Sequence, residues 1–322
     1  MAAVARRSGD EMTMDRVLYQ IDAFTDRLFG GNPAGVVPYA DGMTAAQMQA
    51  LARELNNSET AFISRDASPD YDLHIRYFTP TAEVPVCGHA TIASGHALLA
   101  EGWTAPQTVR IRTGAGILAI ELHPASAGFR ISMRQGAIVL GAPLADALVQ
   151  RIVAALGLQA ADLDTRCPIQ VASTGHGKLM IALRRKARLD SLTPNLDALK
   201  TLSAEIGCNG YYLFTFDAGE PGVLVAGRMF APAIGIAEDP VTGNANGPLG
   251  AYLAAHRLVP LPERTLTFVA KQGEAIGRTG YVGVAVALDQ HGAPQSVTIS
   301  GNAVTVFRTT LALDTPPQQD PQ

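Results

Sequence analysis

Apolar residues in this chain recur mostly at every second position, in short runs that glycine and proline interrupt. Residues 17–24 (VLYQIDAF) and 71–78 (YDLHIRYF) alternate in this way, which predicts strands. A longer period marks residues 44–55 (TAAQMQALAREL), where the apolar side chains share one face and Thr44 stands at the N-cap position, as in an amphipathic helix. Strands outnumber helices and regular βαβα alternation is absent, so the pattern predicts an α+β fold.

Two segments of the chain share a glycine-bearing turn that opens into an apolar helix. They are residues 87–99 (CGHATIASGHALL) and 238–253 (EDPVTGNANGPLGAYL). Superimposing the Cys-Gly-His of the first on the Thr-Gly-Asn of the second also brings similar pieces upstream and downstream roughly into register. The pattern predicts an internal duplication, with a period much longer than that of a solenoid repeat. We therefore expect two lobes, each a curled and mostly antiparallel sheet around a central helix.

The duplication also suggests where the lobes begin and end. We expect an N-terminal lobe over residues 15–137, which the last strand would complete, and a C-terminal lobe over residues 138–312. Residues 1–14 and 313–322 are then tails, the second of them rich in proline and glutamine.

The later turn has the features of an anion-binding site. We expect its helix to begin near Ala245, with Thr242 or Asn244 capping the first turn and Gly243 allowing close approach of the backbone. A helix start offers free N–H groups and a partial positive charge, so a carboxylate or phosphate can bind there without a lysine or arginine. Asp239, just before the turn, would face the bound anion.

Composition limits the classes of partner. The chain has 322 residues, 47% of them hydrophobic and 17% charged, and a formal net charge of -4. This length can bury two cores, and the charge gives no reason to expect nucleic acid or an anionic membrane surface. No leader or membrane-spanning stretch is visible, so we expect a cytoplasmic protein. Cys87, Cys167 and Cys208 fit neither a disulfide framework nor zinc spacing, and we expect no metal.

Three residues could carry chemistry, and their types alone leave the roles open. Glu59 lies between the amide-rich residues 56–58 and an apolar strand, so it is either a structural cap or a partly desolvated acid/base with a raised pKa. His89, at a helix start, either bonds a neighbour or relays a proton as a neutral imidazole. Cys87 could be a nucleophile, but a two-thiol racemase needs a second cysteine where this chain has Thr242.

The chain resembles the PhzF-like phenazine-biosynthesis family, which shares the diaminopimelate epimerase fold. The resemblance covers nearly all of residues 17–311. It rests on five motifs in the same order and spacing: IDAFTDRLFGGNPAGVV, ARELNNSETAFI, IRYFTPTAEVPVCGHATIASGHAL, RMFAPAIGIAEDPVTGNANGPLGAYL and KQGEAIGRTGYV.

The resemblance implies two pseudo-symmetric lobes with the site in the cleft between them, often in a homodimer. It also implies isomerisation without a cofactor or a metal. In the phenazine enzyme of this family, trans-2,3-dihydro-3-hydroxyanthranilate loses a proton from one carbon and regains it at another.

The family's functional residues fall on particular positions of this chain. By resemblance, the proton-moving glutamate is Glu59, its accompanying histidine and aspartate are His89 and Asp239, and the substrate carboxylate would lie near Gly88 and Gly243.

Three further residues complete the substrate-binding set expected from the resemblance: Thr242, Asn244 and Gln272. The chain departs from the family at two positions, with Asn244 where serine is common and Asn246 where histidine is frequent. An amide cannot pass a proton as a hydroxyl can.

Together these observations favour a cofactor-independent isomerase that shifts a proton on a small carboxylated substrate. Two alternatives stay open: a non-catalytic protein that binds small anions on the same fold, and an epimerase that uses the single thiol of Cys87. We expect no nucleic-acid or membrane partner, and a homodimer.

Overall fold

The computed structural model describes residues 5–8, 11–65, 68–102, 108–125, 128–261 and 264–314. Within them the chain divides into two compact units, and each is built mainly from one half of the sequence. The first unit holds the described residues of Met1–Ala23, Pro33–Phe129 and Ala303–Gln322. The second holds those of Phe24–Asn32 and Arg130–Asn302.

The segment Phe24–Asn32 belongs to the second unit, although the expected range of residues 15–137 assigned it to the N-terminal lobe. Its backbone explains why. The N–H of Phe24 donates to the carbonyl of Asn302 at 2.8 Å, and the carbonyl of Phe24 accepts from Tyr281 at 2.7 Å. The last strand lies in the first unit, where it pairs with the first long strand of the chain.

The helices of the first unit are α1 (Ala45–Leu55) and α2 (Gly88–Ala100). Its strands are β1 (Ala5–Ser8), β2 (Glu11–Ala23), β3 (Asn32–Val37), β4 (Glu59–Ser64), β5 (Leu73–Phe78), β6 (Glu83–Val84), β7 (Thr108–Thr113), β8 (Gly116–Ala125) and β19 (Ala303–Asp314).

Pairing in the first unit is mixed but mostly antiparallel. Strand β3 runs parallel to β4, β4 antiparallel to β5, and β5 antiparallel to β6 and parallel to β7, which turns back into β8. The long ribbon of β2 and β19 is antiparallel and carries one bulge.

The helices of the second unit are α3 (Asp146–Ala155), α4 (Lys186–Asp190), α5 (Leu196–Ile206) and α6 (Gly243–Ala255), with 3-10 turns at Ala160–Asp162, Pro232–Ile234 and Glu274–Ile276. Its strands are β9 (Gly128–Arg134), which begins in the first unit, β10 (Val139–Pro143), β11 (Gln170–Ser173), β12 (Lys178–Ala182), β13 (Tyr211–Thr215), β14 (Val225–Ala231), β15 (Ile236–Asp239), β16 (Thr265–Gln272), β17 (Gly280–Leu288) and β18 (Pro294–Gly301).

The second unit repeats the strand pairing of the first. Strand β12 is parallel to β13, β13 antiparallel to β14, and β14 antiparallel to β15 and parallel to β16, which turns back into β17. Thus β12 to β17 correspond in order to β3 to β8, with α5 in the place of α1 and α6 in the place of α2. The expected α+β fold of two pseudo-symmetric, epimerase-like lobes is confirmed.

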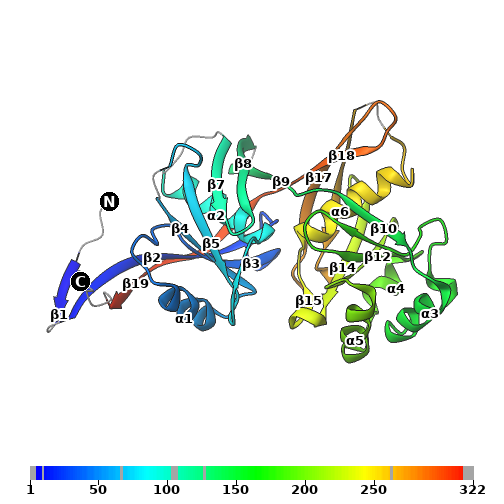
Figure 1. Ribbon diagram of the computed structural model, residues 1–322, viewed down its shortest axis with the longest axis horizontal. Helices are drawn as coiled ribbons and strands as arrows, with labels where there is room; N and C mark the ends of the chain where they lie inside the picture. The colour runs from blue at the N-terminus through cyan, green and yellow to red at the C-terminus, as the bar shows by residue number, and fades with distance from the viewer. Residues whose placement is uncertain are drawn as a thin grey trace. The chain divides into compact units, whose positions relative to one another are not determined.

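The helices α2 and α6 are the central helices of their units, drawn in cyan and yellow in Figure 1. Each has 13 residues and is buried almost all round, because its sequence is apolar or small on every face. Small residues are required where strands approach: a Cβ on Gly250 would lie 2.7 Å from Val284 Cγ1. No helix in the described part of the chain is both long and apolar enough to cross a bilayer.

The amphipathic helix expected at residues 44–55 is present as α1, and its start is the predicted one. Thr44 is the N-cap in a full capping box: its Oγ1 accepts from the N–H of Gln47 at 3.2 Å, and its own N–H donates to Gln47 Oε1 at 2.9 Å. The helix ends at Leu55, and the left-handed backbone of its C-cap, Asn56, turns the chain toward Glu59.

The C-terminal end of α2 is fixed by Glu101, whose side chain is only 12% exposed. Its carboxylate accepts hydrogen bonds from the hydroxyl groups of Tyr19 and Tyr39, the second at 2.7 Å, and from Arg308 Nε at 3.0 Å. A negative charge at a helix C-terminus is unfavourable, and Arg308 offsets it. Burial acts to raise the pKa of Glu101, but the bonds from Tyr19, Tyr39 and Arg308 outweigh it and leave the pKa below its usual value.

We predict that Glu101→Gln lowers the free energy of unfolding at pH 7 by about 1–3 kcal/mol, because it weakens three bonds to a charged group. The folded-state pKa of Glu101 is below the unfolded one, so its stabilisation is present above the unfolded pKa and is lost as the pH falls through the folded pKa. Urea unfolding at pH 7 and in acid should therefore show a difference that shrinks in acid. Glu121→Gln, at an exposed pair with His123, is the control and should change little. A pH-independent loss in Glu101→Gln would contradict this account.

Candidate active site

Glu59 begins β4, at the point where the chain leaves α1 and enters the sheet of the first unit. The strand is held in register by its parallel neighbour β3, in which Ala34 pairs with Glu59. Its side chain is only 17% exposed. The residues after it are fully buried, so the sequence change from polar turn to apolar strand places this carboxylate at the edge of the core.

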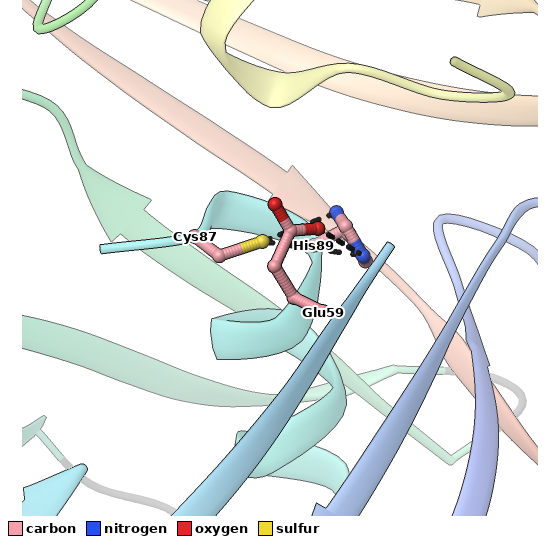
Figure 2. A group of neighbouring side chains, drawn as sticks. All are labelled: Glu59, Cys87 and His89. Atoms are coloured by element: carbon pink, nitrogen blue, oxygen red, sulfur yellow. Dashed lines mark hydrogen bonds and ion pairs between the residues drawn. The ribbon is translucent and has the colours of Figure 1, made fainter. Parts of the chain in front are cut away.

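Cys87 and His89 stand at the start of α2, with Cys87 as its N-cap, and both are 6% exposed. Figure 2 shows these side chains directed toward Glu59. His89 Nε2 lies 3.5 Å from Glu59 Oε2 and 3.2 Å from Ser58 Oγ, while His89 Nδ1 lies 3.3 Å from Cys87 Sγ. The structure thus brings together two of the three expected catalytic residues, Glu59 and His89, with the thiol as a third member.

The electrostatic environment of Glu59 sets it apart from most carboxylates. Burial raises its pKa, and hydrogen bonds with Ser58 and Cys87 counteract this only in part. Among the described residues, no lysine or arginine forms an ion pair with it, and the nearest nitrogen of a basic side chain is His89 Nε2, at 3.5 Å. A carboxylate with a raised pKa is suited to proton transfer near neutral pH.

The start of α2 lies beside this cluster, and its first backbone N–H groups have no acceptor within the helix. Cys87 provides no side-chain cap, and its carbonyl accepts from Thr91 N–H in the first helical bond at 3.0 Å. The preceding N–H groups, including that of the buried Gly88, have no acceptor within the helix. A carboxylate can bind them together with the positive end of the helix.

In the second unit, the carboxylate of Asp239 ends β15 and organises the turn before α6. Asn32 Nδ2 donates to its Oδ1 at 2.8 Å, and the hydroxyl of Thr242 donates to its Oδ2. The expectation that Thr242 or Asn244 caps α6 is therefore wrong, since α6 has no side-chain cap and the Thr242 hydroxyl is drawn to Asp239. The helix begins at Gly243, two residues before the expected start.

Gln272 holds the same turn from β16. Its Nε2 donates to the carbonyl of Asp239 at 2.8 Å and to Thr242 Oγ1 at 3.1 Å, and its Oε1 accepts from Thr242 N–H at 3.1 Å and Asn246 Nδ2 at 2.9 Å. Asn246 is fully buried, and its Oδ1 accepts from the Tyr212 hydroxyl at 2.5 Å. Both amides are occupied by protein groups, so in this structure they position the turn.

Sequence reasoning missed Gln135 and Thr174, which hold the first turn of α6. Gln135 Nε2 donates to the carbonyl of Gly243 at 3.0 Å and to Asn244 Oδ1 at 3.1 Å. Its Oε1 accepts from Thr174 Oγ1 at 2.7 Å. These residues lie far from the turn in sequence, and no motif marks them as partners. Asn244 is thereby positioned with its backbone N–H left without an intrahelical acceptor.

Lys178, at the start of β12, is another residue that sequence analysis did not single out. It is buried, and its Nζ donates to Asn209 Oδ1 at 2.5 Å. Burial lowers its pKa to about 8, although the negative charge of Asp239 acts in the opposite direction. The second unit therefore holds a buried cation in the electrostatic field of the Asp239 turn.

The cluster in the first unit also has the composition of a metal site. Glu59, Cys87 and His89 each offer a ligand atom, and these atoms all lie within 4.8 Å of one another. Spacing alone did not reveal the set, because Glu59 is distant in sequence and reaches the helix start through the sheet.

Comparison with known proteins supports the resemblance along the chain. The family of phenazine biosynthesis-like proteins matches residues 21–309. An uncharacterized isomerase of Clostridium acetobutylicum is 50% identical over 297 residues, which are 92% of this chain and 98% of the relative. The trans-2,3-dihydro-3-hydroxyanthranilate isomerase of Pseudomonas chlororaphis is 33% identical over 301 residues, 91% of this chain and 98% of the relative.

Solved structures with a similar fold support the same family. The Bacillus anthracis phenazine biosynthesis protein of the PhzF family has a TM-score of 0.84 and 31% identity, and the alignment covers 92% of this chain and 99% of that one. A hydroxyproline epimerase from Agrobacterium vitis, with a TM-score of 0.61 and 15% identity over 94% of both chains, shares the fold. The repeated sheet, the paired helix starts and the match over nearly the whole length lead to one conclusion: the chain belongs to the PhzF family of phenazine biosynthesis-like proteins.

Proposed function

We propose that this isomerase shifts a proton within a small carboxylated substrate and that Glu59 carries the proton. The observation on which the proposal rests is the position of Glu59: a largely buried carboxylate at a strand start, 3.5 Å from His89 Nε2 and beside an uncapped helix start. The relatives named as isomerases support the reaction class.

The proposed chemistry is general acid/base catalysis with one carboxyl group in both roles. Glu59 takes a proton from a carbon made acidic by the substrate's unsaturated or carboxylated framework, and it returns the proton to another carbon. The substrate's atomic composition is unchanged. The raised pKa of Glu59 makes the carboxylate a stronger base and keeps the carboxylic acid available for the return step. His89, bonded to Ser58 and adjacent to Glu59, orients the carboxylate.

The carboxylate of the substrate needs donors, and each uncapped helix start is by itself a candidate to supply them. In the first unit these are the backbone amides that begin with Gly88, and in the second those of Gly243 and Asn244. Asp239 and Thr242, fixed by Asn32 and Gln272, would shape the second of these sites. We propose that these backbone groups, rather than a lysine or arginine, bind the anion.

The substrate class follows from the relatives only in outline. A relative at 33% identity is named for trans-2,3-dihydro-3-hydroxyanthranilate, a cyclic carboxylate, which makes this compound a candidate substrate. The relative at 50% identity is named as an isomerase without a substrate. We therefore propose a small carboxylate with an acidic C–H bond, of which that compound is one case.

A second candidate is an epimerase that uses the thiol of Cys87, which lies 3.3 Å from His89 Nδ1. The thiol is at a helix start, where a thiolate is favoured. Substitution separates the two candidates, because Cys87→Ala abolishes a thiol-dependent reaction and leaves Glu59 to carry the proton in the reaction that we propose.

Incubation of the protein with candidate carboxylates in D₂O should introduce deuterium into the recovered substrate or product, as read by mass spectrometry. The expectation follows because a proton held on Glu59 can exchange with solvent before it is returned. A protein that only binds anions would give none. Complete lack of deuterium and of any product, across a panel that includes trans-2,3-dihydro-3-hydroxyanthranilate, would count against the proposed function.

Glu59→Gln should lower kcat/KM by about 10²–10⁴, because the amide preserves the shape of the side chain but cannot accept the proton. Glu54→Gln, on the exposed face of α1, is the matched control and should retain wild-type activity. Steady-state kinetics with the substrate found by deuterium incorporation would measure both variants, and circular dichroism would verify their folding. Activity of Glu59→Gln within tenfold of wild type would remove Glu59 from the proposed role.

A further inference from the structure

The side chains of Glu59, Cys87 and His89 form a compact set of three metal-ligating groups of different chemistry (Figure 2). We propose that this set binds a zinc ion, and that the bound ion switches the enzyme off. The evidence that zinc binds is the geometry of the cluster. Only its inhibitory consequence rests on the proposed function, in which Glu59 moves the proton.

The types of ligand favour zinc among divalent cations. A thiolate, an imidazole and a carboxylate are all zinc ligands, and three protein ligands with an open fourth position are the usual arrangement in catalytic zinc centres. Magnesium and calcium select oxygen ligands and would be poorly matched to Cys87 and His89. The cluster therefore discriminates between metals by its chemistry.

The separations within the cluster are close to those that zinc requires. Zinc bonds of about 2.0–2.3 Å in a tetrahedron place neighbouring ligand atoms about 3.3–3.7 Å apart. With Nε2 as the ligand atom of His89, Cys87 Sγ lies 3.9 Å and Glu59 Oε2 3.5 Å from it, and the three ligand atoms all lie within 4.8 Å of one another. Rotation of these side chains about their own bonds would close the set around an ion, while the strand and the helix remain in place.

The surroundings of the cluster also suit a bound cation. Ser58 Oγ, 3.2 Å from His89 Nε2, can bond the outer face of a metal-bound water or fill the fourth position. Cys87 at the N-terminus of α2 has the helix dipole to favour its thiolate, the form that binds metal. Among the described residues, Glu59 has no lysine or arginine ion-pair partner that a dication would have to displace.

Zinc bound here would stop the proton shift by occupying the groups that perform it. A carboxylate bound to a dication is a much weaker base toward a C–H bond, and a metal-bound imidazole can no longer orient it toward the substrate. The metal-free protein is then the active form, and removal of zinc restores the reaction.

The binding test uses cobalt as a spectroscopic substitute for zinc on the tag-free, full-length protein after treatment with a chelator. Wild-type protein should bind one cobalt ion per chain and show a thiolate-to-cobalt charge-transfer band in the near ultraviolet, which zinc displaces and millimolar magnesium does not. Cys87→Ser should lose the band, and Glu59→Gln and His89→Gln should weaken binding at least tenfold. Thermal melting would show that each variant folds.

Cys167→Ser and Cys208→Ser are the matched controls, since both thiols are buried in the second unit. Each should keep the full cobalt band. A band that persists in Cys87→Ser, or wild-type protein that shows no saturable band, would overturn the site.

The inhibition test measures deuterium incorporation by wild-type protein with and without one equivalent of zinc. Exchange should fall at least tenfold with zinc and return on addition of a chelator. Unchanged exchange in protein shown to hold zinc would overturn the switch. If the metal-free protein exchanges no substrate, the proposed function fails, and the metal site is judged by the cobalt spectrum alone.

Discussion

The requirement that a buried helix start must find partners for its free N–H groups governs both units of this protein. The helices α2 and α6 lie inside their sheets, and neither has a side-chain cap. Buried donors without partners are costly, so the first N–H groups of each helix favour an acceptor. The turns before the helices are shaped accordingly, with Gly88 and Gly243 as first residues. A Cβ on Gly243 would lie 2.4 Å from Ile299 Cδ1, so the end of that side chain would have to shift.

The duplicated scaffold carries different chemistry in its two copies. The N-cap of α2 is Cys87, which lies against His89 and Glu59, whereas the N-cap of α6 is Thr242, whose hydroxyl donates to Asp239. The first copy gathers groups that can exchange protons or bind a cation. The second copy uses amides, in Gln272 and its neighbours, to hold a carboxylate and a backbone turn in place. The two copies thus share a fold and differ in the side chains at their helix starts.

The sequence predicted features that depend on local periodicity and missed those that depend on contacts between distant segments. The capping box of α1 and the doubled helix-and-sheet pattern are local or repeated, and the structure contains both. The expected cap by Thr242 failed because Asp239, three residues earlier, competes for the same hydroxyl and is itself fixed by Asn32 from a distant loop. Gln135 and Lys178 likewise act through tertiary contacts. Glu59 could be singled out as a candidate, but its proximity to Cys87 required the fold.

Two carboxylates near the ends of α2 show why the environment, more than the residue type, decides their roles. Glu101 at the C-terminal end faces the unfavourable end of the helix dipole, and Arg308 with two tyrosines compensates and lowers its pKa. Glu59 at the N-terminal end is buried beside neutral donors, and its pKa is raised. The lowered pKa of the first favours its anionic form, which accepts three hydrogen bonds within the first unit. For the second, the described residues include no lysine or arginine in an ion pair, and this underlies both roles that we propose for it, as a base and as a metal ligand.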